Sequence, residues 1–262
     1  MLHFITFLHP ANNEWVTFIH GAGGSSSIWY KQIRDFKAQF NVLLIDLRGH
    51  GMSKKPIYEK LKEYTFEVIG DEVIEVLDHL AILKSHFVGI SLGTIIIRDL
   101  CERYPARMQS LILGGAVMKL NVRGQFLMRL GDLLKSVLPY VILYRFFAFI
   151  IMPRKKHRES RNLFIREAQH LYQKEFKRWF TLVAEINPLL KFFRFKDSGV
   201  PTLYIMGSED HMFLPSISKL VEYHAMSTLH VIPACGHVVN VEQPQEFNRI
   251  ALSFLTEGLR SR

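Results

Sequence analysis

The hydrophobic positions of the chain fall into short continuous runs, separated by stretches with helical periodicity. The short runs are rich in β-branched residues, which is typical of strands buried on both faces of a sheet. We predict strands at residues 2–8, 15–19, 41–45, 86–88, 110–113, 202–206 and 229–232. Apolar residues that recur every three or four positions predict helices at residues 28–40, 66–80, 94–103, 216–224 and 243–255.

Strand and helix alternate along most of the chain, and this order predicts an α/β fold. A mostly parallel central sheet covered by helices on both faces accounts for the alternation, because parallel strands need crossover connections. The alternation breaks between residues 118 and 196, where three prolines interrupt several helical patterns. We therefore predict a core of residues 1–117 and 197–262, with a helical cap at 118–196 inserted after the strand at 110–113.

Composition limits the classes of protein. At 262 residues, with 48% hydrophobic and 22% charged residues, the chain can bury a large core, which excludes a disordered or fibrous protein. Cys101 and Cys235 are too few for a disulfide scaffold, and no signal-peptide pattern is present, so a cytoplasmic location is expected. The longest apolar stretch, residues 137–152, is shorter than the roughly 20 residues that span a bilayer, so we expect no transmembrane segment.

The net charge of +9 is concentrated in the predicted cap. Residues 118–196 hold 17 Lys and Arg against 5 Asp and Glu, a balance of +12, so the rest of the chain sums to −3. The same stretch holds 14 of the 32 aromatic residues. The basic cluster at 154–158 is most simply a solvated face, and weak peripheral contact with a membrane is the alternative. No recognition motif accompanies the charge, so no nucleic-acid partner is expected.

The sequence Gly-Ile-Ser-Leu-Gly at residues 89–93 is the most informative chemical motif. It lies where the strand at 86–88 turns into the helix at 94–103. A serine at the apex of such a turn is held in a strained conformation with its hydroxyl exposed, and small flanking residues let strand and helix approach. Ser91 is therefore a candidate nucleophile, although the motif alone also fits an ordinary tight turn.

Three other turns follow predicted strands, at the sheet edge where α/β proteins gather functional groups. The glycine-rich turn at 20–25 lacks the dinucleotide fingerprint and the P-loop lysine, so we expect it to expose backbone N–H groups. The turn after the sixth strand supplies Glu209 and Asp210, which compete for the role of an acid. The turn after the last strand supplies His237, a candidate base that could also be an ordinary loop histidine.

Together these segments resemble the α/β-hydrolase superfamily over nearly the whole chain. The chain order Ser91, Asp210, His237 is the order that this superfamily uses. The matching motifs are the His-Gly turn at 20–21 followed by Trp29, Asp-x-Arg-Gly-His-Gly-x-Ser at 46–53, the turn at 89–93, Gly207-x-x-Asp210, Gly236-His237 and Glu242-x-Pro244.

The resemblance implies a serine hydrolase that works through an acyl-enzyme. Ser91 would attack a carbonyl, His237 would take its proton, and Asp210 would orient the imidazole. The resemblance also implies that backbone N–H groups of Ala22 and Leu92 hold the oxyanion. Gly21, Ile90 and Val238 would border the substrate pocket. His20 and His50 would hold loops, and no metal or cofactor is expected.

The expected substrate is a small-molecule carboxylic ester, and the basic, aromatic cap favours medium-chain or amphiphilic acyl groups. Lactonase, C–C hydrolase and acyltransferase chemistry share the scaffold. A small-molecule receptor or signalling module with a retained triad is a second class of function. The cap residues that can line the pocket or pack against the sheet are Phe126, Leu127, Leu130, Leu134, Phe146, Phe147, Phe149, Phe176, Trp179 and Phe180.

Overall fold

The structure, a computed structural model, describes residues 1–54, 64–119, 125, 130–131, 138–169, 171, 173–184 and 186–260. Seven strands overlap the seven predicted runs. They are β1 (Phe4–Phe7), β2 (Trp15–Ile19), β3 (Asn41–Ile45), β4 (Ser85–Ile90), β5 (Met108–Gly114), β6 (Thr202–Gly207) and β7 (Ser227–Ile232).

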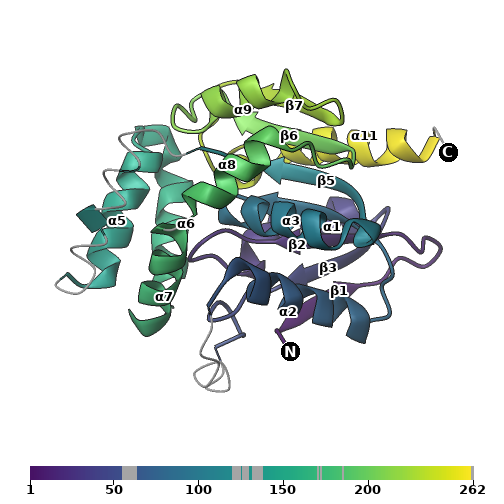
Figure 1. The fold of residues 1–262 in the computed structure, drawn as a ribbon, viewed down its shortest axis with the longest axis horizontal. Helices are drawn as coiled ribbons and strands as arrows, with labels where there is room; N and C mark the ends of the chain where they lie inside the picture. The colour runs from purple at the N-terminus through teal and green to yellow at the C-terminus, as the bar shows by residue number, and fades with distance from the viewer. Residues whose placement is uncertain are drawn as a thin grey trace.

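The strands form one sheet in the order β1-β3-β2-β4-β5-β6-β7 (Figure 1). β1 pairs antiparallel with β3, whereas all the other neighbouring strands are parallel. Parallel strands place all their carboxyl ends at one edge, so the turns that follow β2, β4, β6 and β7 meet there. The predicted α/β class, with a mostly parallel central sheet, is confirmed.

Helices cover both faces of this sheet. The predicted helix at 28–40 divides into a short 3₁₀ turn and α1, and the predicted helix at 243–255 is preceded by one more helical turn, because Pro244 starts a new helix. The helices of the core are η1 (Ser26–Trp29), α1 (Tyr30–Lys37), α2 (Phe66–His79), α3 (Leu92–Arg103), η3 (Pro105–Arg107), α9 (Leu214–Val221), α10 (Val239–Glu242) and α11 (Pro244–Arg260).

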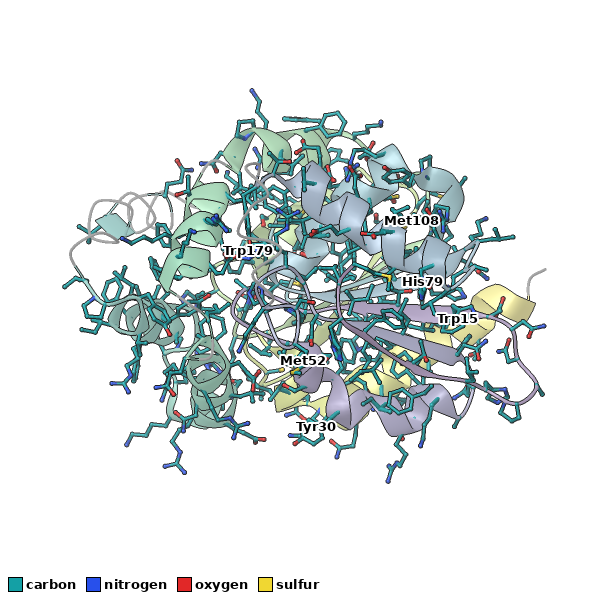
Figure 2. The ribbon with its side chains drawn as sticks, turned by 90° about the horizontal axis from the view of Figure 1, so that it is seen from below. Trp15, Tyr30, Met52, His79, Met108 and Trp179 are labelled. Atoms are coloured by element: carbon teal, nitrogen blue, oxygen red, sulfur yellow. The ribbon has the colours of Figure 1, made fainter. Side chains whose placement is uncertain are left out.

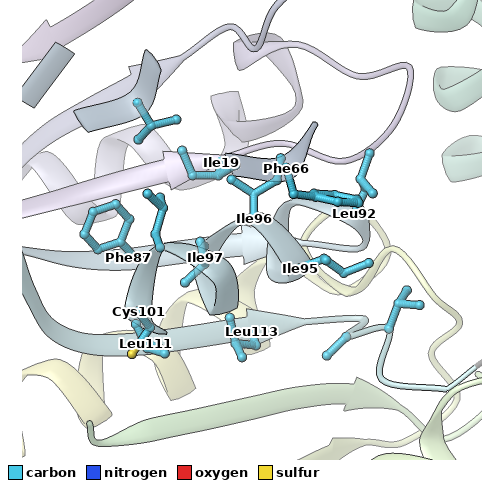
Figure 3. Packing of buried hydrophobic residues seen from close by; sticks show 14 of the residues in the cluster. Ile19, Phe66, Phe87, Leu92, Ile95, Ile96, Ile97, Cys101, Leu111 and Leu113 are labelled. Atoms are coloured by element: carbon cyan, nitrogen blue, oxygen red, sulfur yellow. The ribbon is translucent and has the colours of Figure 1, made fainter. Parts of the chain in front are cut away.

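Alternate strand residues build two hydrophobic layers, one on each face of the sheet. Phe18 and Val88 point to the layer that includes residues of α1 and α11. Their neighbours Ile19 and Phe87 point to the layer that includes α2 and α3. Figure 3 shows part of the second layer, where apolar side chains at residues 95–97 of α3 face side chains of the strands. Because strand side chains alternate between the two faces of the sheet, those on this face pack against α3 and hold it, together with the turn before it, against the sheet.

Among the described residues between β5 and β6, five helical segments have defined bounds, and we call them the cap helices. They have a small hydrophobic core of their own, which includes Tyr144 and Phe176. Trp179, which is labelled in Figure 2, connects them to the core, because its Nε1 donates to the Arg48 carbonyl at 3.1 Å. The segments are α5 (Tyr140–Ile151), η4 (Lys155–His157), α6 (Arg158–Ala168), α7 (Gln173–Ala184) and α8 (Asn187–Phe195).

Some sequence predictions for this region concern residues outside the described ranges. Phe126, Leu127 and Leu134, which we predicted to line the pocket or pack the cap, are among them. Of the helices that the structure describes, none combines the length and the apolar character needed to cross a membrane.

Candidate active site

Ser91 lies in the turn between β4 and α3 with a backbone conformation that few residues adopt. Its φ of 53° and ψ of −120° are outside the comfortable range for a residue with a side chain. Two hydrogen bonds hold this conformation: the Ser91 N–H donates to the Gly114 carbonyl at 3.0 Å, and Thr94 Oγ1 donates to the Ser91 carbonyl at 2.6 Å. The turn therefore presents the Ser91 hydroxyl rather than burying it.

Crowding between strand and helix explains the two glycines of this turn. A Cβ on Gly93 would overlap the Ile19 carbonyl oxygen and lie 2.7 Å from the His20 carbonyl oxygen. A Cβ on Gly89 would lie 2.6 Å from Ile97 Cδ1. At Gly93 the close atoms belong to the backbone, so only glycine fits without movement of the backbone, whereas at Gly89 the Ile97 side chain would have to move.

The structure brings Ser91, His237 and Asp210 into one hydrogen-bonded chain. His237 Nε2 is 2.9 Å from Ser91 Oγ, and His237 Nδ1 is 2.7 Å from Asp210 Oδ2. His237 and Asp210 are buried, with 3% and 1% of their surfaces exposed. The Phe213 N–H also donates to Asp210 Oδ1 at 3.2 Å, so the carboxylate is held from both sides. This geometry suits a general base whose tautomer is fixed by a carboxylate.

The neighbouring carboxylate of Glu209 turns the other way, toward the cap helices. It forms ion pairs with Arg154 and Lys156, and its Oε2 lies 3.0 Å from His157 Nε2. The hydrogen bond from Lys156 lowers the pKa of Glu209 to about 2, with Arg154 and His157 acting in the same direction. Of the two acids that the sequence offers, Asp210 is therefore the one that faces His237.

The glycine-rich turn after β2 lies against the serine turn. A Cβ on Gly21 would lie 3.1 Å from Ser91 Cβ, which puts Ala22 beside the nucleophile. Leu92 is the first residue of α3, so its N–H has no partner within the helix. Among the described residues, neither the Ala22 N–H nor the Leu92 N–H donates a hydrogen bond. These two donors are the ones predicted for an oxyanion hole.

His20 and His50 hold the surrounding loops. His20 Nε2 accepts from the Leu47 N–H at 3.0 Å, and His50 Nε2 accepts from the Gly23 N–H at 3.0 Å. Burial lowers the pKa of both imidazoles, that of His50 to about 3. A neutral ring is what these contacts require, because the accepting nitrogen must carry no proton.

A cavity of about 180 Å³ opens above Ser91 and is lined mostly by apolar side chains. The core contributes every predicted pocket and oxyanion residue, namely Gly21, Ala22, Ile90, Leu92 and Val238, together with Ser91 and His237. The segment between β5 and β6 contributes further wall residues, which are Phe147, Ile150, Ile151, Met152, Ser160, Leu163, Phe164, Glu167, Val183 and Ile186.

Sequence reasoning missed several of these wall residues. Phe147 was among the predicted cap residues, and Ile150 and Ile151 lie three and four residues after it on the same face of α5, so periodicity would have found these two as well. Met212 and Phe213 lie two and three residues after Asp210, and their place close to the acid in the chain was a usable signal. Glu167 had no local signal. It accepts a hydrogen bond from Ser25 Oγ, a contact 142 residues apart in the chain.

Other candidate groups take no part in this arrangement. Burial raises the pKa of the Cys235 thiol to about 12, so it remains a buried thiol rather than a thiolate nucleophile. His211 is exposed and lies 3.3 Å from the Glu209 carbonyl oxygen. Among the residues described, His, Cys, Asp and Glu form no group of three or more with the geometry of a metal site.

Known proteins match this chain over most of its length. The family described as alpha/beta hydrolase fold matches residues 14–244. A 3-oxoadipate enol-lactonase of Acinetobacter baylyi is 28% identical over 94% of this chain and 90% of its own length. A hydrolase structure from Pseudomonas aeruginosa covers 96% of this chain and 93% of its own, with a TM-score of 0.80 and 24% identity. An enol-lactonase structure from Burkholderia xenovorans covers 97% and 96%, with a TM-score of 0.77 and 20% identity. The chain belongs to the α/β hydrolase family.

Proposed function

We propose that this protein is a serine hydrolase that cleaves carboxylic esters through an acyl-enzyme on Ser91. The observation that carries the proposal is the hydrogen-bonded chain from Asp210 through His237 to Ser91, which ends at the floor of an apolar cavity. Membership of the α/β hydrolase family supports it. The buried acid, the shielded base and the serine that faces the cavity match the roles that acyl transfer needs.

In the first half of the reaction, Ser91 Oγ adds to the ester carbonyl while His237 Nε2 accepts the hydroxyl proton. The carbonyl oxygen becomes an oxyanion, which the N–H groups of Ala22 and Leu92 stabilise. Asp210 stabilises the imidazolium that forms. When the tetrahedral intermediate collapses, the C–O bond to the alcohol breaks and His237 returns its proton to the leaving oxygen. An acyl-enzyme remains.

In the second half, water repeats these steps on the acyl-enzyme. His237 takes a proton from the attacking water, and the oxyanion forms again between the same two N–H groups. Collapse breaks the bond to Ser91 Oγ and returns the proton to that oxygen. The products are a carboxylic acid and the regenerated serine. Every proton and every bond is accounted for by Ser91, His237, the ester and water.

The cavity walls support a substrate with an apolar acyl part. Phe147, Ile150 and Phe164 face the same space as Ser91, and an acyl chain of medium length would bury apolar surface against them. We further propose that residues 118–196 form the cap unit that sets this preference. The relatives named enol-lactonases favour a second candidate, the opening of a cyclic ester, in which both products stay in one molecule.

The chemistry is tested by labelling the purified protein with a fluorophosphonate and locating the adduct by mass spectrometry. We expect one adduct, on Ser91, and none in Ser91→Ala. Cys235→Ala is the matched control, because it removes the other nucleophilic atom near the base and should still be labelled. An unlabelled native protein, or an adduct at another residue, would refute the assignment of Ser91.

Substrate class is tested with esters from acetyl to palmitoyl and with a panel of lactones. We expect the highest kcat/KM at intermediate chain length. A strict preference for acetyl would contradict the proposed role of the cap, and faster turnover of lactones would favour the second candidate. A receptor with a retained triad would be labelled at Ser91 yet turn over every ester at a rate close to that of Ser91→Ala.

A further inference from the structure

Helix α5 is apolar on every side. Its sequence from Tyr140 to Ile151 contains one charged residue, Arg145, among twelve. A helix that is hydrophobic all round is normally buried all round, or else it faces a partner that is not water. The surroundings of α5 show which of the two applies.

Two faces of α5 are covered by the protein. Tyr144 and Ala148 are buried, and Phe147 and Ile150 line the cavity above Ser91. The third face is open to solvent, and Figure 1 shows α5 at the outer edge of the molecule. Its large apolar side chains have 50%, 45% and 54% of their surfaces exposed, and they are Ile142, Phe146 and Phe149.

These three residues form a continuous outer stripe. Spacings of four and three residues place Ile142, Phe146 and Phe149 on one side of the helix, one above the other. Other large exposed hydrophobic residues lie elsewhere, such as Leu83 after α2 and Tyr223 after α9. A row of apolar side chains on one helix face is the arrangement by which helices lie on a bilayer surface.

The charge around the outer stripe is positive. Arg145 is exposed on α5, and Lys155 and Arg158 are exposed just beyond its carboxyl end. Within the described residues, none of these three cations has an ion pair. The acid nearest in sequence, Glu159, pairs with Lys31 of the core. Cations that flank an apolar stripe complement anionic headgroups.

We propose that the outer stripe of α5, with Arg145, Lys155 and Arg158, docks the protein on an anionic membrane surface. A second copy of the chain is a poorer occupant, because it would bring the same cations against these ones. The inner face of α5 borders the cavity, so docking would place the cavity beside the lipid from which an amphiphilic ester would come. The supply of an ester from the membrane to the cavity rests on the proposed function, whereas the docking itself does not.

The test is sedimentation of the full-length Ser91→Ala protein with sucrose-loaded vesicles, so that no hydrolysis alters the lipid. Vesicles of phosphatidylcholine alone are compared with vesicles that also contain phosphatidylglycerol. We expect binding to the anionic vesicles only, and binding that weakens as salt is added. The double variant Ile142→Ser/Phe146→Ser should weaken this binding more than about tenfold, because it removes the apolar surface that enters the bilayer.

Leu83→Ser/Tyr223→Ser is the matched control, because it removes apolar side chains that are exposed by 83% and 82% away from α5. It should bind vesicles like the parent protein, and circular dichroism should show that both double variants are folded. Failure of the parent to bind anionic vesicles would overturn the proposal, as would equal losses in the two variants. Light scattering that shows a dimer abolished by Ile142→Ser/Phe146→Ser would assign the outer stripe to self-association instead. Labelling of Ser91 is measured separately, so the two proposals fail independently.

Discussion

Replacement of Gly93 by alanine tests whether the packing of α3 against β2 sets the geometry at Ser91. The new Cβ would lie 2.7 Å from the His20 carbonyl oxygen, and nearer still to that of Ile19, whereas ordinary contact begins at 3.4 Å. The two backbones must therefore separate by at least about 0.7 Å. One of them leads to Ala22 and the other carries Leu92, so the two N–H donors move apart.

Gly93→Ala should lower both the stability of the protein and the reactivity of Ser91. Overpacking of this kind typically costs about 1–3 kcal/mol, which lowers Tm by several degrees in a chain of this size. A shift of about 1 Å in a catalytic group can cost about 100-fold in rate. The assays are thermal unfolding followed by circular dichroism and the rate of fluorophosphonate labelling, which does not depend on knowing the substrate.

Gly70→Ala is the matched control for Gly93→Ala. The same change within α2 meets the movable tip of Arg103, and a Cβ there lies 3.1 Å from Leu100 Cδ2 rather than against a carbonyl oxygen. We expect little change in Tm, since alanine is favoured over glycine within a helix, and an unchanged labelling rate. Our reasoning would be refuted if Gly93→Ala kept both the parent Tm and the parent labelling rate.

Three further predictions follow from the same contacts. Asp210→Asn should slow labelling of Ser91 by about 10⁴-fold with the fold intact, whereas Glu209→Gln should cost less than about tenfold; similar losses would contradict the roles given to the two acids. Burial lowers the pKa of His50 from 6.5 to about 3, so the stability due to its neutral ring is complete above pH 6.5 and is lost as the pH falls toward 3, by about 1.4 kcal/mol per pH unit. Urea unfolding should show that the free energy of unfolding of His50→Gln falls less steeply with decreasing pH, between pH 6.5 and 3, than that of the parent protein. An equally steep fall in the variant would exclude His50 as the cause. Burial raises the pKa values of the Cys101 and Cys235 thiols to about 11 and about 12, so a thiol reagent at pH 8 should react only after unfolding, and rapid reaction of the native protein would contradict their burial.

The catalytic candidates could be read from the sequence because each follows a strand with a local signal. Ser91 has two glycines beside it, and Asp210 and His237 each follow a short apolar run. Their meeting follows from parallel strand order, since all carboxyl ends lie at one edge. Strand positions were predictable for the same reason, because a buried strand is a continuous apolar run.

Contacts between the cap helices and the core were not predictable in this way. Glu209 pairs with Lys156 and His157, and Glu167 accepts from Ser25, across more than 50 and 140 residues of chain respectively. A charge cluster indicates that a partner is possible, but it does not say which carboxylate is nearby. The basic cluster at 154–158 was most simply a solvated face, yet two of its cations and His157 contact Glu209. Such pairs depend on how helices dock, which local periodicity does not encode.

Two of the contacts that join the cap helices to the core are made by residues that do not line the cavity. At one, His157 and Lys156 contact Glu209, beside the acid. At the other, Trp179 donates to Arg48. Helix α5, which contributes Phe147, Ile150 and Ile151 to the cavity, precedes both attachments in the chain. The cavity wall formed by α5 and these two contacts therefore involve different residues, so α5 could be exchanged or diversified in directed evolution while the contacts to Glu209 and Arg48 are kept.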